Sequence, residues 1–157
     1  MKRENMAQSS ETLTERDAAV AWARTYNALD PSHIAPLLAD DIRYASQWVL
    51  FEEIGNRPDF LEHLTSKLET IRRSSCVVRA ELAETRPYPM YLNPPRPCVV
   101  VERNGNREST VLFEVEDHRI TRIDMCAIPP PHSCVCSGEF PGLDPTAEAP
   151  TNRAERH

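Results

Sequence analysis

Seven residues of this chain have side chains that could line or operate a small-molecule site: Trp22, Tyr26, Tyr44, Ser46, Trp48, His63 and Asp124. Aromatic rings can form the walls of an apolar pocket, and a histidine beside a carboxylate can act as a general base. We predict that these seven residues bind a ligand, and we assign no catalytic residue. The spacing of Trp22, Tyr26 and Tyr44 also fits core positions, and the spacing of His63 and Lys67 favours a solvent-exposed edge.

A second group, near the C-terminus, consists of Cys126, His132, Cys134 and Cys136. Thiolates and imidazoles are zinc ligands, but structural zinc sites usually separate their cysteines by two residues rather than one. Two alternatives are unreactive free thiols and oxidation of Cys134 with Cys136 or Cys126, which needs an oxidising setting. We expect no bound metal and no cofactor.

The elements that must position these residues follow from hydrophobic periodicity. Helices are predicted over 14–29, 31–38 and 57–73, and strands over 42–50, 76–82, 98–103, 108–116 and 119–128. Thr14 and Asp17 form a capping box, and Asp30 and Asn56 can cap the second and third helices. Asn104-Gly105 predicts a tight hairpin, because both residues tolerate positive φ.

This order, helices followed by an antiparallel run of strands, predicts an α+β domain with helices on one face of a curved sheet. Alternate residues of a strand point the same way, so Tyr44, Ser46 and Trp48 share a face. Residues 1–12 are polar and aperiodic and are predicted to be a disordered lead. The domain itself spans 13–130, and 131–157 is predicted to be a flexible, Pro/Ala-rich tail.

Composition narrows the function classes. The chain has 157 residues, a formal net charge of -6 and no run of basic residues, so we expect one domain that binds no nucleic acid. It lacks the run of about 18 apolar residues that a membrane helix requires. Five irregularly spaced cysteines do not form a disulfide framework, so we expect a cytoplasmic protein.

Several segments resemble SnoaL-like proteins of the nuclear-transport-factor-2-like superfamily. Residues 26–30 and 34–41 resemble the second helix and the "ADD" step into the first strand. Residues 55–57 resemble the family's glycine turn, and 114–120 its closing hairpin. The resemblance covers roughly 14–128 and implies three helices of the N-terminal half packed on a strongly curved, mixed, mainly antiparallel sheet. This sheet would form a cone with a central pocket.

The resemblance does not choose a reaction, because the family includes isomerases, cyclases, hydrolases and non-catalytic proteins. It places Trp22, Ser46 and Val111 where ketosteroid isomerases have a tyrosine, a base and a second acid. Serine is a poor proton acceptor at neutral pH, so that chemistry is not expected. The Asp-Arg-Asp set of epoxide hydrolases has no clear counterpart either.

Three functions follow. The favoured one is binding of a small apolar molecule in the cone pocket. The first alternative is an isomerase, cyclase or hydrolase that uses a pocket histidine or carboxylate. The second is a non-catalytic module that forms a homodimer through the open face of its sheet, since isologous dimers are the commonest oligomers.

Overall fold

The computed structural model describes residues 12–48, 53–86 and 94–143, so nearly all of the predicted disordered lead lies outside the described residues. The elements in chain order are α2 (Glu15–Ala28), η1 (Pro31–His33), η2 (Ala35–Leu37), β1 (Leu38–Ser46), β2 (Glu53–Ile54), α3 (Arg57–Arg73), β3 (Val78–Glu84), β4 (Pro97–Arg103), β5 (Asn106–Glu116), β6 (Arg119–Cys126), η3 (Pro131–Ser133) and β7 (Val135–Cys136).

The two α-helices begin at the residues that the sequence indicates. Thr14 caps α2 through a complete capping box, in which the Asp17 backbone N–H donates to Thr14 Oγ1 at 3.1 Å and Thr14 N–H donates to the Asp17 carboxylate at 3.0 Å. Asn56 caps α3 by accepting from the Asp59 backbone N–H at 2.8 Å. Both predicted caps are confirmed, and they fix the first turns of the helices that flank the cavity described below.

The second predicted helix is built differently from the expectation. Asp30 caps it as predicted, but residues 31–37 form two short 3-10 turns, η1 and η2, instead of one α-helix. Pro36 explains the difference. Its ring has no N–H to donate to the carbonyl four residues back, and it disfavours the α conformation at Ala35.

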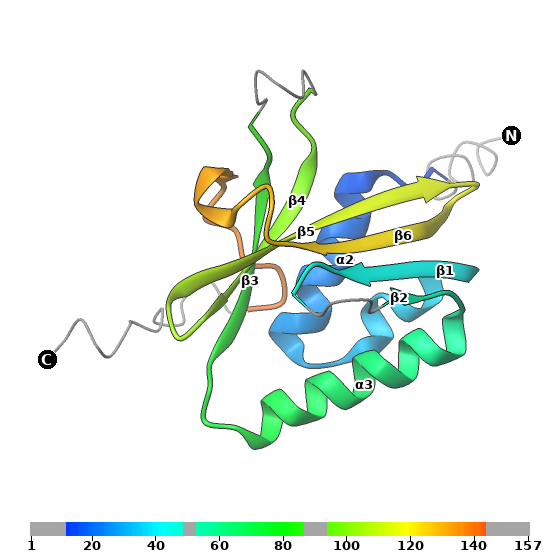
Figure 1. The fold of residues 1–157 in the computed structure, drawn as a ribbon, viewed down its shortest axis with the longest axis horizontal. Helices are drawn as coiled ribbons and strands as arrows, with labels where there is room; N and C mark the ends of the chain where they lie inside the picture. The colour runs from blue at the N-terminus through cyan, green and yellow to red at the C-terminus, as the bar shows by residue number, and fades with distance from the viewer. Residues whose placement is uncertain (1–11, 49–52, 87–93, 144–157) are drawn as a thin grey trace, which may run out of the picture.

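The sheet has seven strands in the order β2-β1-β6-β5-β4-β3-β7 (Figure 1). β1 runs parallel to β6, and every other neighbouring pair is antiparallel. The predicted strand over 42–50 therefore pairs with the C-terminal meander, and it begins earlier than predicted, at Leu38. The sheet is strongly twisted but open, since β2 and β7 form its two edges.

Two tight hairpins link the strands of the meander. Asn104 and Gly105 have φ angles of 53° and 87°, as a hairpin turn with two left-handed residues requires. Asp117 and His118 form the next turn with φ angles of 51° and 64°. The predicted Asn104-Gly105 turn is confirmed, and it pairs Arg103 with Asn106, while an irregularity one step further along the ladder brings Val101 opposite Ser109 on the inner face.

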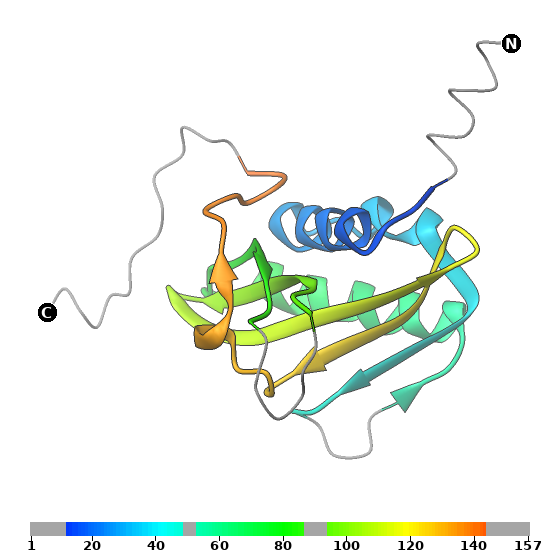
Figure 2. The same ribbon diagram turned by 90° about the horizontal axis from the view of Figure 1, so that it is seen from above.

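Both helices lie against one face of the sheet, with α2 over β3 to β5 and α3 over β1 (Figure 2). The main core forms between these layers. Trp22 stacks on Tyr26 at 5.0 Å between ring centroids, and its ring edge meets Phe113 at 6.0 Å. Tyr44 packs on Phe60 at 5.3 Å, so aromatic contacts join both helices to the strands. The predicted α+β class, with helices on a mixed, mainly antiparallel sheet, is confirmed.

Residues 131–143, which the sequence assigns to a flexible tail, pack onto the domain. β7 pairs with β3, and the backbone N–H groups of Leu82 and Ser137 bond to the carbonyls of Glu139 and Leu82 at 3.0 and 2.9 Å. Asn27 on α2 donates to the Pro141 carbonyl at 2.7 Å. The physical reason is the exposed backbone of β3, whose unpaired groups the later segment satisfies. Within the described ranges, no helix has the length and apolar character needed to cross a membrane.

Candidate functional site

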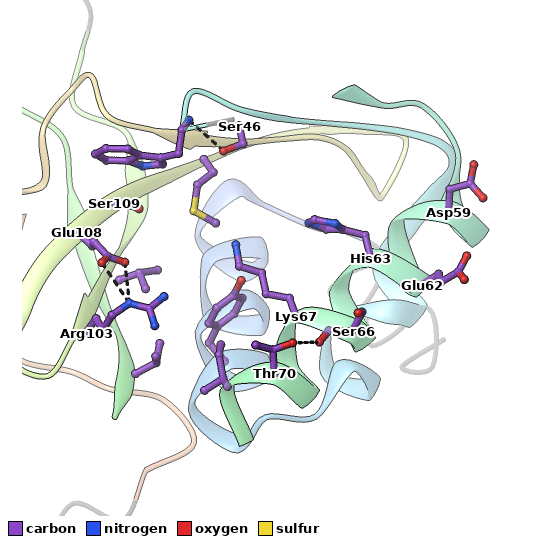
Figure 3. Close-up of a pocket in the computed structure, with 16 residues that line it drawn as sticks. Ser46, Asp59, Glu62, His63, Ser66, Lys67, Thr70, Arg103, Glu108 and Ser109 are labelled. Carbon is purple, nitrogen blue, oxygen red and sulfur yellow. Dashed lines mark hydrogen bonds and ion pairs between the residues drawn. The ribbon is translucent and has the colours of Figure 1, made fainter. Parts of the chain in front are cut away.

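A cavity of about 780 Å³ lies between α3 and the inner face of the sheet (Figure 3). This volume falls in the range of small-molecule sites, roughly 300–1,000 Å³. Its lining residues are Tyr26, Ser46, Trp48, Asp59, Glu62, His63, Ser66, Lys67, Thr70, Ile71, Val78, Val101, Arg103, Glu108, Ser109 and Met125.

One wall of the cavity is a polar stripe of α3. The stripe consists of Asp59, Glu62, His63, Ser66, Lys67 and Thr70, whose spacing of three and four residues places them along one side of the helix. The adjacent stripe, Phe60, Leu64, Leu68 and Ile71, is buried in the core. His63 points into the cavity, while the carboxylates of Asp59 and Glu62 point away from it (Figure 3).

The opposite wall is mainly apolar. Strand alternation turns Val78 of β3, Val101 of β4 and Met125 of β6 toward the helices, and each of them borders the cavity. Ser46 of β1 and Ser109 of β5 add two hydroxyl groups to this wall. A ligand in the cavity would therefore meet side chains of different polarity on its two sides.

Tyr26, from α2, brings a buried hydroxyl to the cavity. Its side chain is 2% exposed, and its hydroxyl oxygen has no hydrogen-bond partner among the described residues. Burial, reinforced by Tyr44, raises the pKa of the Tyr26 phenol well above its usual range. The hydroxyl is therefore a neutral donor at the cavity wall, suited to an oxygen or nitrogen acceptor on a ligand.

An ion pair stands at the hairpin side of the cavity. Arg103 Nε lies 3.1 Å from a carboxylate oxygen of Glu108, across the Asn104-Gly105 turn. The arginine also faces Cys76, and hydrogen bonding from Arg103 lowers the pKa of this thiol. The pair restrains the Arg103 guanidinium and compensates the Glu108 carboxylate beside it.

The structure divides the residues predicted to bind a ligand. Four of them, Tyr26, Ser46, Trp48 and His63, line the cavity together. Trp48 lies beyond the end of β1 and is 56% exposed, so it contributes to the rim rather than to a buried strand face. Lys67, for which the spacing favours a solvent-exposed edge, also lines the cavity.

The other three predicted residues lie elsewhere. Trp22 and Tyr44 are almost fully buried in the main core, where they contact other aromatic rings instead of the cavity. Asp124 lies on the opposite face of the sheet, because its neighbours Ile123 and Met125 point toward the helices. It pairs there with Arg122 Nε at 2.9 Å.

Sequence reasoning missed most of the α3 stripe and the pair at the hairpin. A usable signal was present, since residues 59, 62, 63, 66, 67 and 70 form a continuous polar stripe beside the apolar one. Arg103 gave a weaker signal: it continues the alternation of Val99 and Val101 on the inner face of β4.

The C-terminal cysteines and histidine do not assemble as a metal centre in the part of the chain that the structure describes. No group of three or more His, Cys, Asp or Glu residues is placed there to hold an ion. His132 is exposed, whereas Cys126 and Cys134 are buried. All five cysteines are free thiols.

The element order and the strand order, with β1 added parallel to β6, define an α+β fold with helices on one face of a mixed, mainly antiparallel sheet. No family model matches the sequence, and no curated protein matches it either.

Several solved structures are similar to this chain. An NTF2-like protein of unknown function from Cytophaga hutchinsonii is 10% identical over 75% of this chain and 95% of its own, with a TM-score of 0.46. A protein with a cystatin-like fold from Caulobacter vibrioides is 16% identical over 80% and 89%, with a TM-score of 0.48. An LEH-like epoxide hydrolase from M. tuberculosis is 18% identical over 73% and 81%, with a TM-score of 0.42.

Proposed function

We propose that this protein binds a small, largely apolar molecule that carries a hydrogen-bond acceptor, in the cavity between α3 and the sheet. The observation that supports this most is the Tyr26 hydroxyl, which is buried, neutral and without a partner among the described residues. A buried hydroxyl left unpaired costs about 1–3 kcal/mol, and an acceptor on a ligand offsets that cost.

The two walls support an amphipathic ligand. Val78, Val101 and Met125 offer an apolar surface to its body, and the α3 stripe offers His63 and Lys67 to its polar edge. With Asp59 and Glu62 turned outward and Glu108 paired with Arg103, the groups that face the cavity favour an oxygen-bearing neutral or anionic ligand over a cation.

The test uses two probes of matched shape, acetylnaphthalene and ethylnaphthalene, of which only the first carries a carbonyl acceptor. We expect the wild type to bind acetylnaphthalene about 3- to 10-fold more tightly, the value of one hydrogen bond. Tyr26→Phe should remove this difference while leaving ethylnaphthalene binding unchanged. Titration calorimetry of the wild type and of Tyr26→Phe with each probe gives four affinities. Together they measure the coupling free energy between the Tyr26 hydroxyl and the carbonyl of the probe.

Thr25→Val is the matched control for this experiment. Thr25 also carries a buried hydroxyl without a partner in the described residues, on the same helix, but it does not line the cavity. The control should retain the preference for acetylnaphthalene. Equal affinity of the wild type for both probes, or an equal loss in both variants, would show that Tyr26 does not recognise the ligand.

An enzyme of the isomerase, cyclase or hydrolase type is the second candidate, and the position of His63 favours it. The imidazole points into the cavity and packs against the Tyr44 ring at 5.2 Å, so a general base would be held beside a bound molecule. The test is to incubate the protein with acetylnaphthalene for a long time and to recover the probe. Recovery of chemically unchanged acetylnaphthalene would support binding rather than catalysis. The homodimer through the sheet face stays a prediction.

A further inference from the structure

The sheet face opposite the helices carries a second, smaller apolar cluster. Its buried members are Ala83, Cys98, Val100 and Cys134, with Leu112 and Cys136 packed against them. The segment of η3 and β7 covers this cluster and separates it from solvent. Cysteines make up half of its buried residues, although small aliphatic residues would fill the same space.

Cys98 and Cys134 are both buried members of this cluster, and their side chains are close enough to shift each other's pKa. Cys98 lies on β4 and is fully buried, and Cys134 follows η3 and is 6% exposed. Cys134 Sγ also lies 3.8 Å from Thr110 Oγ1 on β5. A thiol of the central sheet thus meets a thiol of the C-terminal segment.

The strand register separates this pair from the neighbouring thiol. Ala83 on β3 lies between Cys98 on β4 and Cys136 on β7, since it pairs with both. Two strand spacings amount to about 9.6 Å, which exceeds the limit of roughly 7 Å between the Cα atoms of a disulfide. Cys136 is therefore out of bonding reach of Cys98, which leaves Cys134 as the partner thiol that shares its buried cluster.

The surroundings make the two thiols unequal. The hydrogen bond from Cys98, followed by those from Thr110 and Ser133, lowers the pKa of Cys134 to about 6 against the opposing effect of burial. The positive charge of Arg107 acts in the same direction. The same hydrogen bond and burial raise the pKa of Cys98 far above its usual range. Cys134 is thus the more readily ionised thiol of the two, and Cys98 is its protonated neighbour.

We propose that Cys134 and Cys98 form a redox site that reacts with small hydroperoxides and closes to a reversible disulfide. The Cys134 thiolate attacks one peroxide oxygen, so that an S–O bond forms, the O–O bond breaks, and hydroxide or alkoxide leaves. The Cys98 sulfur then attacks the Cys134 sulfur, forming the S–S bond and breaking the S–O bond. The departing hydroxide takes the Cys98 proton and leaves as water.

In this sequence two thiols are oxidised and one hydroperoxide is reduced. A dithiol restores the reduced pair by thiol–disulfide exchange. The disulfide would join β4 covalently to the segment between η3 and β7. The exposed fraction of Cys134 is small, which favours a small oxidant such as hydrogen peroxide.

The experiment treats the full-length reduced protein with hydrogen peroxide, blocks the remaining thiols, and maps the peptides by mass spectrometry without reduction. We expect a linked peptide that contains Cys98 and Cys134, lighter by two hydrogens and released by dithiothreitol. Cys134→Ser should abolish the link. Cys98→Ser should leave Cys134 as a sulfenic acid that dimedone traps.

Cys76→Ser is the control, because Cys76 lies outside the cluster and should leave the link intact. Near-UV circular dichroism checks that each variant is folded. A second measurement needs only the wild type: at pH 7, iodoacetamide should modify Cys134 about tenfold faster than Cys98. A link to Cys126 or Cys136 instead, no link at all, or faster modification of Cys98 would overturn the proposal.

Discussion

At the scale of single residues, the chain carries buried polar atoms that the described protein does not satisfy. Trp22 Nε1, Thr25 Oγ1 and the Tyr26 hydroxyl are all on α2, and of these residues only Tyr26 borders the cavity. The first two do not face this cavity, whereas the third can be satisfied by a ligand in it. This distinction connects the packing of one helix to the proposed recognition of an acceptor.

Cys134 should make the stability of the reduced protein depend on pH. Its folded pKa of about 6 lies below the value of about 8.5 expected for an unfolded thiol, so the unfolded state binds more protons between these values. The contribution of Cys134 to stability is therefore present above the unfolded pKa and lost as pH falls toward 6. The titratable or charged groups next to it are Cys98, Arg107, Cys126 and Cys136.

The measurement is urea unfolding in a phosphine reductant at several values of pH. The difference in free energy of unfolding between the wild type and Cys134→Ser should grow from pH 6 to pH 8.5. A difference that stays constant or shrinks over this range would contradict a lowered pKa. Cys76→Ser serves as the comparison, because its thiol is outside the buried cluster.

Residue types alone identified part of the site. Tyr26, Ser46, Trp48 and His63 stood out in the sequence because aromatic, hydroxyl and imidazole groups are informative wherever they occur. The placement of Asp124 required the strand register, which a single sequence fixes poorly. The contact of Cys98 with Cys134 depends on a chain reversal over the sheet, for which the sequence carries no local pattern.

At the scale of elements, α3 has two adjacent stripes of side chains, one that packs in the core and one that lines the cavity. Phe60, Leu64 and Leu68 bury themselves in the core, and the polar stripe from Asp59 to Thr70 forms a cavity wall. Helix starts were well predicted, because a cap is a local signal between residues three apart. The type of the second helix was predicted wrongly, because Pro36 changes the hydrogen bonding of a segment whose apolar spacing still fits an α-helix.

The Asn56 cap should matter for α3 as a whole. Asn56→Ala removes the side-chain acceptor of the Asp59 N–H and should lower the free energy of unfolding by about 1 kcal/mol. Asn56→Asp keeps an acceptor oxygen and should remain close to the wild type. Chemical denaturation measures both variants, and equal destabilisation by the two substitutions would show that the cap hydrogen bond is not the cause.

At the scale of the whole molecule, the chain closes over itself at one edge of the sheet. Residues 131–143 pair with β3, bond to Asn27 on α2, and cover the outer cluster. The Arg79 guanidinium also lies over the Phe140 ring, with its Cζ atom 3.9 Å from the ring centroid, in a cation–π contact. The Pro/Ala-rich composition of 131–157 predicts flexibility for the whole stretch, and the tertiary contacts of 131–143 with β3 show otherwise for that part.

Truncation should separate the two parts of the predicted tail. A variant ending after Pro130 loses the hydrogen bonds to Leu82 and Glu81, worth about 1 kcal/mol each, and should be less stable by about 3 kcal/mol. It should also aggregate more readily, because the edge of β3 is uncovered. A variant ending after Leu143 keeps these contacts and should match the full chain in thermal unfolding. Equal stability of both truncations would contradict this account.

The unlike walls of the cavity have a geometric consequence. A molecule inside it meets an apolar sheet on one side, a polar helix on the other and the Tyr26 hydroxyl as a third fixed point. Three non-equivalent contacts are the least that a surface needs to tell a compound from its mirror image. When a racemic ketone of suitable size is incubated with the protein, the bound fraction should therefore be enriched in one enantiomer.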